Sequence, residues 1–286
     1  MFMKFPGGYW LARVFLSAAF VVPPSGQPAP PQRDGWTLVW SDEFNGSSID
    51  RSKWVFETGA GIWGNEELEY YTDRPANLFL RNGNLVIRAL VEKHAAAGRT
   101  WNFTSARIKT FEKFSQKYGR FEARVRVPPG QGMWSAFWML GDDIAEVGWP
   151  ACGEIDVMEN IGREPSTVHG SIHGPGYTGK IGIEARYTLS DNRRFADDFH
   201  VFAVEWGPNA VNFYVDQHGY ARRSRADLRP GWKWVFDKPF FLILNLAVGG
   251  DWPGNPDTTT IFPGEMLVDY VRVYRAVTTP KPAAHH

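Results

Sequence analysis

The 286-residue chain lacks several features that mark large classes of protein. Its only cysteine, Cys152, excludes an internal disulfide and a zinc site built from cysteines. Its 31 Lys and Arg balance 31 Asp and Glu, so it has no basic surplus with which to bind nucleic acid or acidic membranes. No internal repeat and no long segment with a helical period is present. We therefore expect a globular protein that is not a general binder of nucleic acid or acidic membranes.

Aromatic and other apolar residues are plentiful. The chain has 13 Trp, 10 Tyr and 20 Phe, which is 15% of its residues, and 43% of it is hydrophobic. The apolar share is sufficient for one full core. Because aromatic faces in a groove commonly hold sugar rings, the composition favours a carbohydrate ligand.

The chain divides into three parts. Residues 1–34 combine a leader with a Pro-rich linker, residues 35–277 form one domain, and residues 278–286 are a tail. Lys4 precedes an apolar run over 9–22 that resembles a secretory signal peptide, although Arg13 interrupts it. The run is too short to span a bilayer comfortably. We expect a secreted protein with no membrane segment in its mature form; a leader without a targeting role is the alternative.

The pattern of the domain predicts an all-β fold. Residues 120–127 alternate apolar and charged side chains, and residues 201–206 and 211–215 alternate around a Gly-Pro-Asn turn. The apolar runs 85–91 and 240–248 are typical of strands covered on both faces. Many short strands separated by turns indicate an antiparallel β-sandwich with one concave, aromatic-lined sheet.

Three acids lie close together in the segment 149–160: Glu154, Asp156 and Glu159. In a strand, Glu154 and Asp156 point the same way, whereas Glu159 has the opposite parity. An unpaired carboxylate in the core is costly. A β-bulge near Val157 or Met158 would return Glu159 to the face of the other two acids, and bulges are frequent beside active sites.

Carboxylates on one face repel one another unless they share protons or bind a cation. Shared protons leave one group charged and another protonated. A retaining glycosidase needs such a pair, with carboxyl groups about 5–5.5 Å apart. An acidic edge strand and a calcium site remain alternatives on this pattern alone.

Seven segments carry a resemblance to a known family. They are residues 40–46 (WSDEFNG), 64–72 (GNEELEYYT), 117–123 (KYGRFEA), 130–140 (GQGMWSAFWML), 154–159 (EIDVME), 168–174 (VHGSIHG) and 245–254 (NLAVGGDWPG). In this order they resemble the family 16 glycoside hydrolases, in particular the bacterial laminarinases, which are endo-β-1,3-glucanases. The resemblance implies a jelly roll with an open concave cleft. It also implies that Glu154 is the nucleophile, Glu159 the acid/base and Asp156 their electrostatic helper.

We expect six substrate-binding residues, and the resemblance supports this for Trp134, Trp138, Asn65 and His173. Trp134 and Trp138 would contact sugar rings, or else pack in the core. Arg107 would donate to sugar hydroxyls, or else be an exposed structural charge. The other three are Asn65 in a loop at the non-reducing end, His173 near the acid/base, and Trp252 over one end of the cleft. His169, by contrast, is expected to be a satisfied strand histidine.

Asp269 shares strand parity with Leu267, Val271 and Val273, and an inward-pointing Asp needs a partner. Many family members hold one Ca²⁺ on the convex side. Carried over, this implies a structural calcium site formed by Asp269, Glu43 and the backbone of Gly83. A carboxylate held by backbone N–H groups is the alternative. No organic cofactor is implied.

We therefore expect a monomeric, retaining, endo-acting hydrolase of internal β-1,3 links in laminarin-type glucans. The alternatives are a relative acting on mixed-linkage glucan, agar or carrageenan, and a non-catalytic β-glucan-binding protein on the same fold.

Overall fold

The computed structural model describes residues 32–61 and 64–277. Most of the predicted leader and linker, and the predicted tail 278–286, lie outside the described residues. Among the described residues, no helix is both long enough and apolar enough to cross a membrane.

Two sheets make up the fold. The larger sheet has ten strands. Eight of them run in the order β15 (His218–Ser224), β14 (Ala210–Val215), β13 (His200–Gly207), β8 (Gly119–Arg126), β17 (Gly264–Ala276), β5 (Asn84–Ala96), β6 (Arg99–Ser105), β3 (Glu69–Tyr71). The other two lie off this path: β1 (Trp36–Asp42) pairs with β17, and β4 (Leu78–Arg81) pairs with β5. The smaller runs β12 (Ile183–Thr188), β11 (Thr167–His173), β10 (Glu154–Ile161), β9 (Met133–Gly141), β16 (Phe240–Val248), β7 (Arg107–Lys109), β2 (Val55–Glu57). The helical elements are short: α1 (Ile144–Val147), η1 (Gly179–Ile181) and η2 (Arg225–Asp227).

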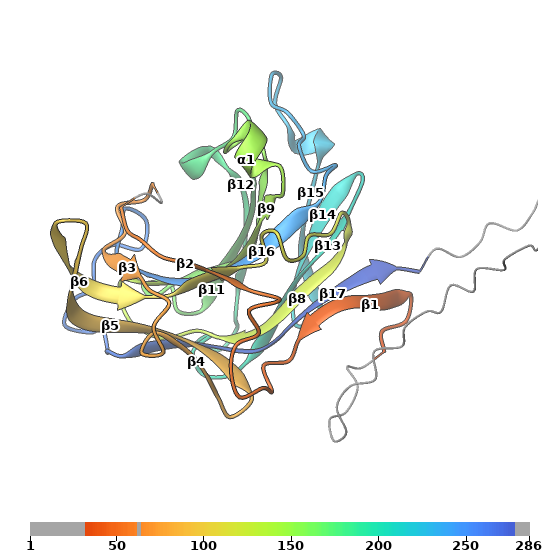
Figure 1. Ribbon diagram of the computed structural model, residues 1–286. Helices are drawn as coiled ribbons and strands as arrows, with labels where there is room; N and C mark the ends of the chain where they lie inside the picture. Colours follow the sequence, from red (N-terminus) through yellow and green to blue (C-terminus); the bar gives the residue numbers. More distant parts are fainter. Residues whose placement is uncertain (1–31, 62–63, 278–286) are drawn as a thin grey trace, which may run out of the picture.

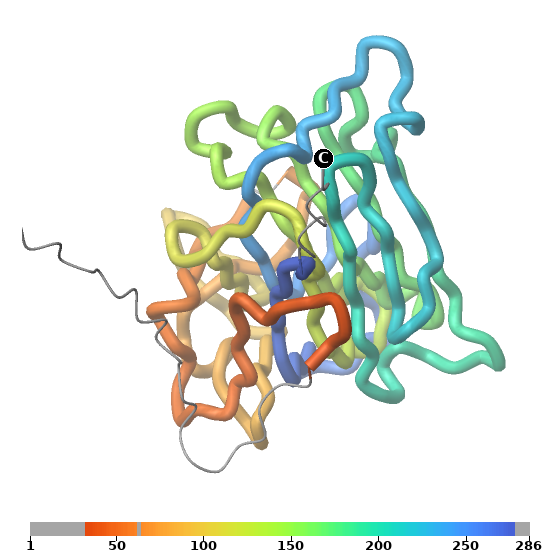
Figure 2. The backbone as a smooth tube through the Cα atoms, turned by 90° about the vertical axis from the view of Figure 1, so that its right-hand side faces the viewer, coloured from red at the N-terminus to blue at the C-terminus, as the bar shows by residue number. Residues whose placement is uncertain are grey.

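The two sheets form the predicted antiparallel sandwich. Figure 1 shows the seven-stranded sheet along the inner side of the arc made by the ten-stranded sheet. The first and last strands, β1 and β17, are paired, and their red and blue tubes lie side by side in Figure 2. Of the pairs formed by the named strands, only β3–β6 is parallel. The all-β prediction is confirmed.

Hydrophobic alternation accounts for the core between the sheets. Phe121, Ala123 and Val125 of β8 are fully buried, as their period predicts. The opposite face of β8 differs from the predicted half-buried strand, since Arg120 is only 1% exposed. This burial is possible because the Arg120 guanidinium donates to Glu122 at 2.8 Å and to Glu205 at 3.1 Å.

The two apolar runs behave differently. Every residue of β16 is buried, so Phe240–Val248 is covered on both faces as predicted. The run 85–91 is covered only in part, because Val91 is 61% exposed where β5 extends beyond the sandwich. β16 is therefore an interior strand of the smaller sheet, next to the central strand β9, which separates it from β10.

The contact between the sheets is close at Gly170 of β11. A Cβ atom there would lie 2.4 Å from the Tyr220 hydroxyl oxygen and 2.6 Å from a ring carbon of Phe213. We expect Gly170→Ala to lower the free energy of unfolding by about 1–3 kcal/mol through overpacking. Gly207→Ala is the matched control, because a Cβ atom there meets nothing within 4 Å. Urea unfolding measures both, and equal midpoints for the two variants would contradict this account of the packing.

Candidate active site

The three predicted acids are on β10 of the smaller sheet. Its pairing with β9 shifts register between Asp156 and Met158, so the predicted bulge is confirmed at Val157. Ile155, Val157 and Met158 are buried on the core side of the strand. The extra residue returns Glu159 to the parity of Glu154 and Asp156, and the three acids share the face turned away from the larger sheet. We call this the carboxylate face.

Asp156 is the centre of the cluster. It accepts a hydrogen bond from the Ser171 hydroxyl at 2.7 Å, and its Oδ2 lies 3.1 Å from Nε2 of His173. Burial opposes a charge on His173, but the hydrogen bond to Asp156 and the nearby carboxylates outweigh it and raise the His173 pKa to about 9. The ring is therefore a cation at neutral pH and offsets part of the negative charge of the acids.

The pKa of each of the two glutamates is raised. Each keeps partial exposure of its side chain, yet burial of the carboxyl group is the largest cause of its raised pKa, followed by the charge of Asp156. The Glu154 pKa rises to about 8. The charge of His173 and the Trp149 indole N–H, which donates to Glu154 at 2.6 Å, both lower this pKa and so limit the rise. The Glu159 pKa rises well above its usual value. Both glutamates therefore hold a proton more strongly than an exposed carboxyl group, and their titrations are coupled.

This arrangement can carry out acid–base and nucleophilic chemistry. One carboxylate and one carboxylic acid on the same face can attack a substrate carbon and protonate a leaving oxygen. Glu154, Asp156 and His173 also offer ligand atoms within 4.8 Å of one another, a spacing that could hold a metal ion. The protonated His173 ring already places a positive charge in that position.

Trp138 is held on this face by hydrogen bonds and by a cation. Its indole donates to Asn245 at 2.7 Å, and the Asn245 amide donates to the Tyr71 hydroxyl at 3.1 Å. The Arg107 guanidinium lies 4.7 Å from the Trp138 ring centroid. Trp138 is half-buried, so one part of its ring remains accessible.

The structure contradicts one of the two interpretations of Arg107, that of an exposed structural charge. Its side chain is 11% exposed and pairs with Glu57, so it is not an exposed structural charge. Lys109 also donates to Glu57, at 2.6 Å. The two cations outweigh the effect of burial and lower the Glu57 pKa. Arg107 is thus fixed over the Trp138 ring.

The sequence prediction missed several residues that position this site. Glu69 is fully buried, accepts the Val248 backbone N–H at 2.7 Å, and has its pKa raised to about 8, chiefly by burial. Ser171 could have been found, because it shares strand parity with His169 and His173. Asn245 and Tyr71 lie within two of the quoted motifs, but their partnership depends on the pairing of distant strands.

Trp134 and Trp252 meet at one end of the carboxylate face, next to the loop that carries Asn65. The Trp134 indole donates to Glu159 at 3.0 Å, and its ring lies edge-on to Trp252, with centroids 5.4 Å apart. The Trp252 loop is joined to the Asn65 loop, since the Asp251 backbone N–H donates to the Asn65 carbonyl at 2.9 Å. The Trp134 indole therefore links the Asn65 and Trp252 loops to Glu159.

His169 is a satisfied strand histidine, as predicted. Its two ring nitrogens lie 2.7 Å from Glu184 and 3.1 Å from Glu164, and the ring is fully buried. It also packs edge-on against Trp252, with centroids 4.9 Å apart.

The comparison with known proteins agrees with this geometry. Residues 57–272 match the model of the glycosyl hydrolases family 16. The chain belongs to family 16. It is 43% identical over 251 residues to the β-glucanase of Rhodothermus marinus, which covers 85% of this chain and 86% of that relative.

Two solved structures of the family are similar over most of their length. The endo-β-1,3-glucanase of Pyrococcus furiosus is 50% identical, with a TM-score of 0.82, over 85% of this chain and 96% of its own. The laminarinase catalytic domain of Thermotoga maritima is also 50% identical, with a TM-score of 0.83, over 86% and 100%. The resemblance inferred from the motifs is confirmed.

The calcium ligands expected from other family 16 members do not fit this structure. The Glu43 carboxylate accepts two hydrogen bonds from Arg272, at 2.7 and 3.0 Å, and Asp269 pairs with Arg124 at 2.8 Å. The expectation that Asp269 points inward is wrong. Its side chain is 36% exposed, because β17 shifts register between Val268 and Tyr270. Gly83, with a φ of 74°, forms part of the β4–β5 turn.

The raised pKa of His173 predicts a pH-dependent contribution to the stability of this family 16 chain. A group whose pKa is higher in the folded state stabilises the fold fully below its unfolded pKa of about 6.5, and this stability is lost as pH rises through about 9. We expect His173→Gln to lower the free energy of unfolding most at pH 6, by on the order of 3 kcal/mol at most, and less at pH 10. Denaturant titrations at both pH values test this, with the exposed His218→Gln as control. A loss for His173→Gln that did not vary with pH would refute it.

Proposed function

We propose that this family 16 chain is a retaining, endo-acting glucanase that hydrolyses internal β-1,3 links in laminarin-type β-glucans. The observation that carries the chemistry is the placement of Glu154 and Glu159 beside Asp156. The two glutamates share one face of a bulged strand, and the pKa of each is raised above its usual value, so the cluster can keep a proton next to a carboxylate. A retaining glycosidase needs one carboxylate and one carboxylic acid in this relation.

In the first step of the proposed reaction, Glu154 attacks the anomeric carbon while Glu159 transfers its proton to the leaving glycosidic oxygen. This breaks the link and forms a glycosyl ester on Glu154. In the second step, Glu159 removes a proton from water, the water oxygen attacks the same carbon, and Glu154 leaves as a carboxylate. Asp156 and His173 keep their partnership throughout, so their charges are preorganised.

The substrate class is supported by the aromatic residues and by the relatives. Trp134 and Trp252 meet next to Glu159, and Trp138 stands beside Asp156 across the β9–β10 pair. Such rings are suited to stacking on glucosyl units. The similar structures from Pyrococcus furiosus and Thermotoga maritima are an endo-β-1,3-glucanase and a laminarinase, respectively.

We also propose that the protein is secreted and acts as a monomer. Export is supported by the basic residue and apolar run at the start of the chain, and by a polysaccharide substrate too large to enter a cell intact.

The double displacement uses only side chains, so we assign no step to an organic cofactor or to calcium.

The substrate proposal predicts a rank order. We expect faster cleavage of laminarin than of barley mixed-linkage glucan, and no cleavage of agarose or carrageenan. Release of reducing ends from each polymer at equal mass concentration measures this. Cleavage of agarose without action on laminarin would favour a galactan-specific enzyme, and binding of laminarin without any cleavage would favour a glucan-binding protein.

The catalytic proposal predicts separable roles for the two glutamates. Replacing either with Ala should lower kcat by about three orders of magnitude or more. With azide and an aryl β-glucoside that carries a good leaving group, Glu159→Ala should give the β-azide through the ester, whereas Glu154→Ala should give the α-azide by direct displacement. NMR of the products decides this.

For the unmodified enzyme, the rate should rise with pH as Glu154 ionises and fall as Glu159 ionises. Exchanged azide products would mean that the two roles are reversed. Net inversion by the unmodified enzyme would rule out the double displacement.

A further inference from the structure

Each of the three acids of β10 has a polar partner on β11 in the cross-strand register. His173 and Ser171 both bind Asp156, as described above. His169 lies opposite Glu159, so these two side chains are neighbours on the carboxylate face. The proposed reaction assigns no step to His169, so its place beside the acid/base needs another explanation.

The His169 ring is held by a carboxylate on each side. Its Nδ1 lies 2.7 Å from Glu184 of β12, and its Nε2 lies 3.1 Å from Glu164, which follows β10 in the chain. A carboxylate only accepts hydrogen bonds, so both ring nitrogens donate when both glutamates are ionised. The hydrogen bond from His169 is the largest cause that lowers the Glu184 pKa to about 2, and Arg186 lowers it further. The ring is fully buried, so these two bonds fix its orientation.

The fixed ring supports the two tryptophans at this end of the carboxylate face. Trp252 packs edge-on against His169, with centroids 4.9 Å apart and an angle of 81° between the ring planes. It packs in the same way against Trp134, at 5.4 Å and 84°. The Trp134 indole N–H donates to Glu159 at 3.0 Å. Trp252 thus stands between the ion-paired ring and the tryptophan that binds the acid/base.

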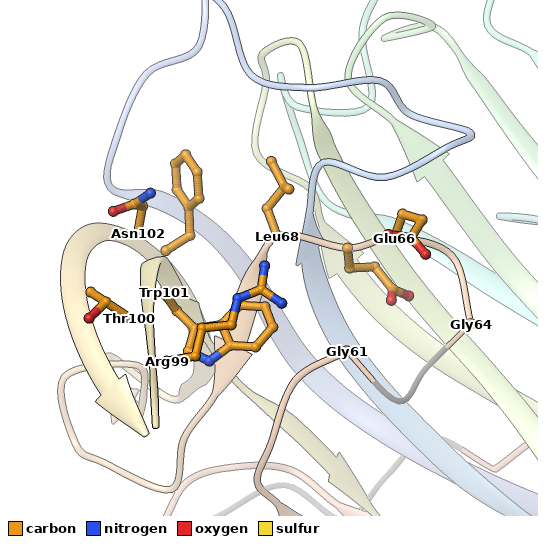
Figure 3. A pocket seen from close by; sticks show the side chains of 10 residues that line it. Gly61, Gly64, Glu66, Leu68, Arg99, Thr100, Trp101 and Asn102 are labelled. Atoms are coloured by element: carbon orange, nitrogen blue, oxygen red, sulfur yellow. The ribbon is translucent and has the colours of Figure 1, made fainter. Parts of the chain in front are cut away.

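The Asn65 loop supports the other side of Trp252. A Cβ atom on Gly250 would lie 2.7 Å from the Asn65 carbonyl oxygen, so the two loops are in close backbone contact. Figure 3 shows Leu68, from the Asn65 loop, beside Arg99 of β6. Backbone contacts therefore fix the Trp252 loop itself, and ring contacts fix the indole that it carries.

We propose that His169 is a positioning residue for the acid/base Glu159. Its ion-paired ring fixes Trp252 against Trp134 and so keeps the Trp134 indole N–H directed at the Glu159 carboxyl group. The inference rests on the proposed function. An acid/base must present its proton within hydrogen-bond reach of the leaving oxygen, so a misplaced carboxyl group transfers the proton slowly even when its strand is unchanged.

The role of His169 is geometric rather than electrostatic. The largest influences on the Glu159 pKa are burial and the charge of Asp156, which raise it, and the charge of His173, which lowers it. A positive charge on His169 is matched by its own two carboxylate partners. The part of His169 that reaches Glu159 is therefore the contact of its ring with Trp252.

The test uses two substrates that differ in their need for an acid. Laminarin has a sugar hydroxyl as its leaving group, which must be protonated, whereas the dinitrophenyl glycoside of the β-1,3-linked glucose disaccharide has a leaving group that departs without a proton. His169→Gln should lower kcat/KM for laminarin about tenfold and leave kcat/KM for the aryl glycoside within about twofold. Glu184→Ala should act in the same direction, and it guards against a folding defect because the Glu184 side chain is 37% exposed.

Two further variants trace the path and control for stability. Trp134→Phe removes the indole N–H but keeps a ring, so it should show the same selective loss, and its combination with His169→Gln should lose no more than the larger single loss. His200→Gln is the matched control. His200 also lies 3.0 Å from a carboxylate, that of Asp216, and packs edge-on against Phe195, but it belongs to β13 of the larger sheet.

Each result separates the positioning role from the function on which it depends. A loss confined to laminarin in the His169 and Glu184 variants, absent from the His200 variant, supports the role. Equal losses on both substrates, no loss on either, or additive losses in the double variant would overturn it and leave the glucanase standing. Failure of the unmodified chain to cleave either substrate would overturn the proposed function, and the positioning role with it.

Discussion

The site depends on how three carboxyl groups are placed on one face of a strand. A regular β10 would direct Glu159 into the core, where an unpaired carboxylate is costly. The bulge at Val157 removes that cost and creates another, since like charges now lie close together. The surrounding residues reduce the repulsion: His173 provides a cation, Ser171 donates to Asp156, and Glu159 retains its proton.

Two tryptophans affect the pKa values of the glutamates in opposite ways, through a hydrogen bond and through exclusion of water. The Trp149 indole donates to Glu154 and the Trp134 indole donates to Glu159, at 2.6 and 3.0 Å. An indole N–H orients one carboxyl oxygen, while the apolar ring limits access of water to the same group. Water exclusion raises the pKa of a carboxyl group, and the hydrogen bond lowers it. The two glutamates have the same kinds of neighbours, and for both of them burial and the charge of Asp156 are the largest causes of the raised pKa.

Much of this could be predicted from sequence, because the decisive signals are local. Strand parity alone required the bulge between Asp156 and Glu159, and alternation predicted β8 and the β13–β14 hairpin. The failures arose where distant strands meet. The bulge in β17 turned Asp269 outward, and Arg272 reaches Glu43 across the β1–β17 pair. No spacing within a single segment indicates that Asn245 holds Trp138.

The buried Glu69 shows why such partners matter to the site. Its carboxyl group retains a proton near neutral pH because burial outweighs the hydrogen bond from Val248. A neutral acid adds no negative charge beneath Tyr71, which accepts the hydrogen bond from Asn245. Asn245 in turn fixes Trp138, whose strand position pairs with Asp156. Protonation thus lets the core accommodate a fourth carboxyl group near the site without adding to the repulsion that β10 already has to balance.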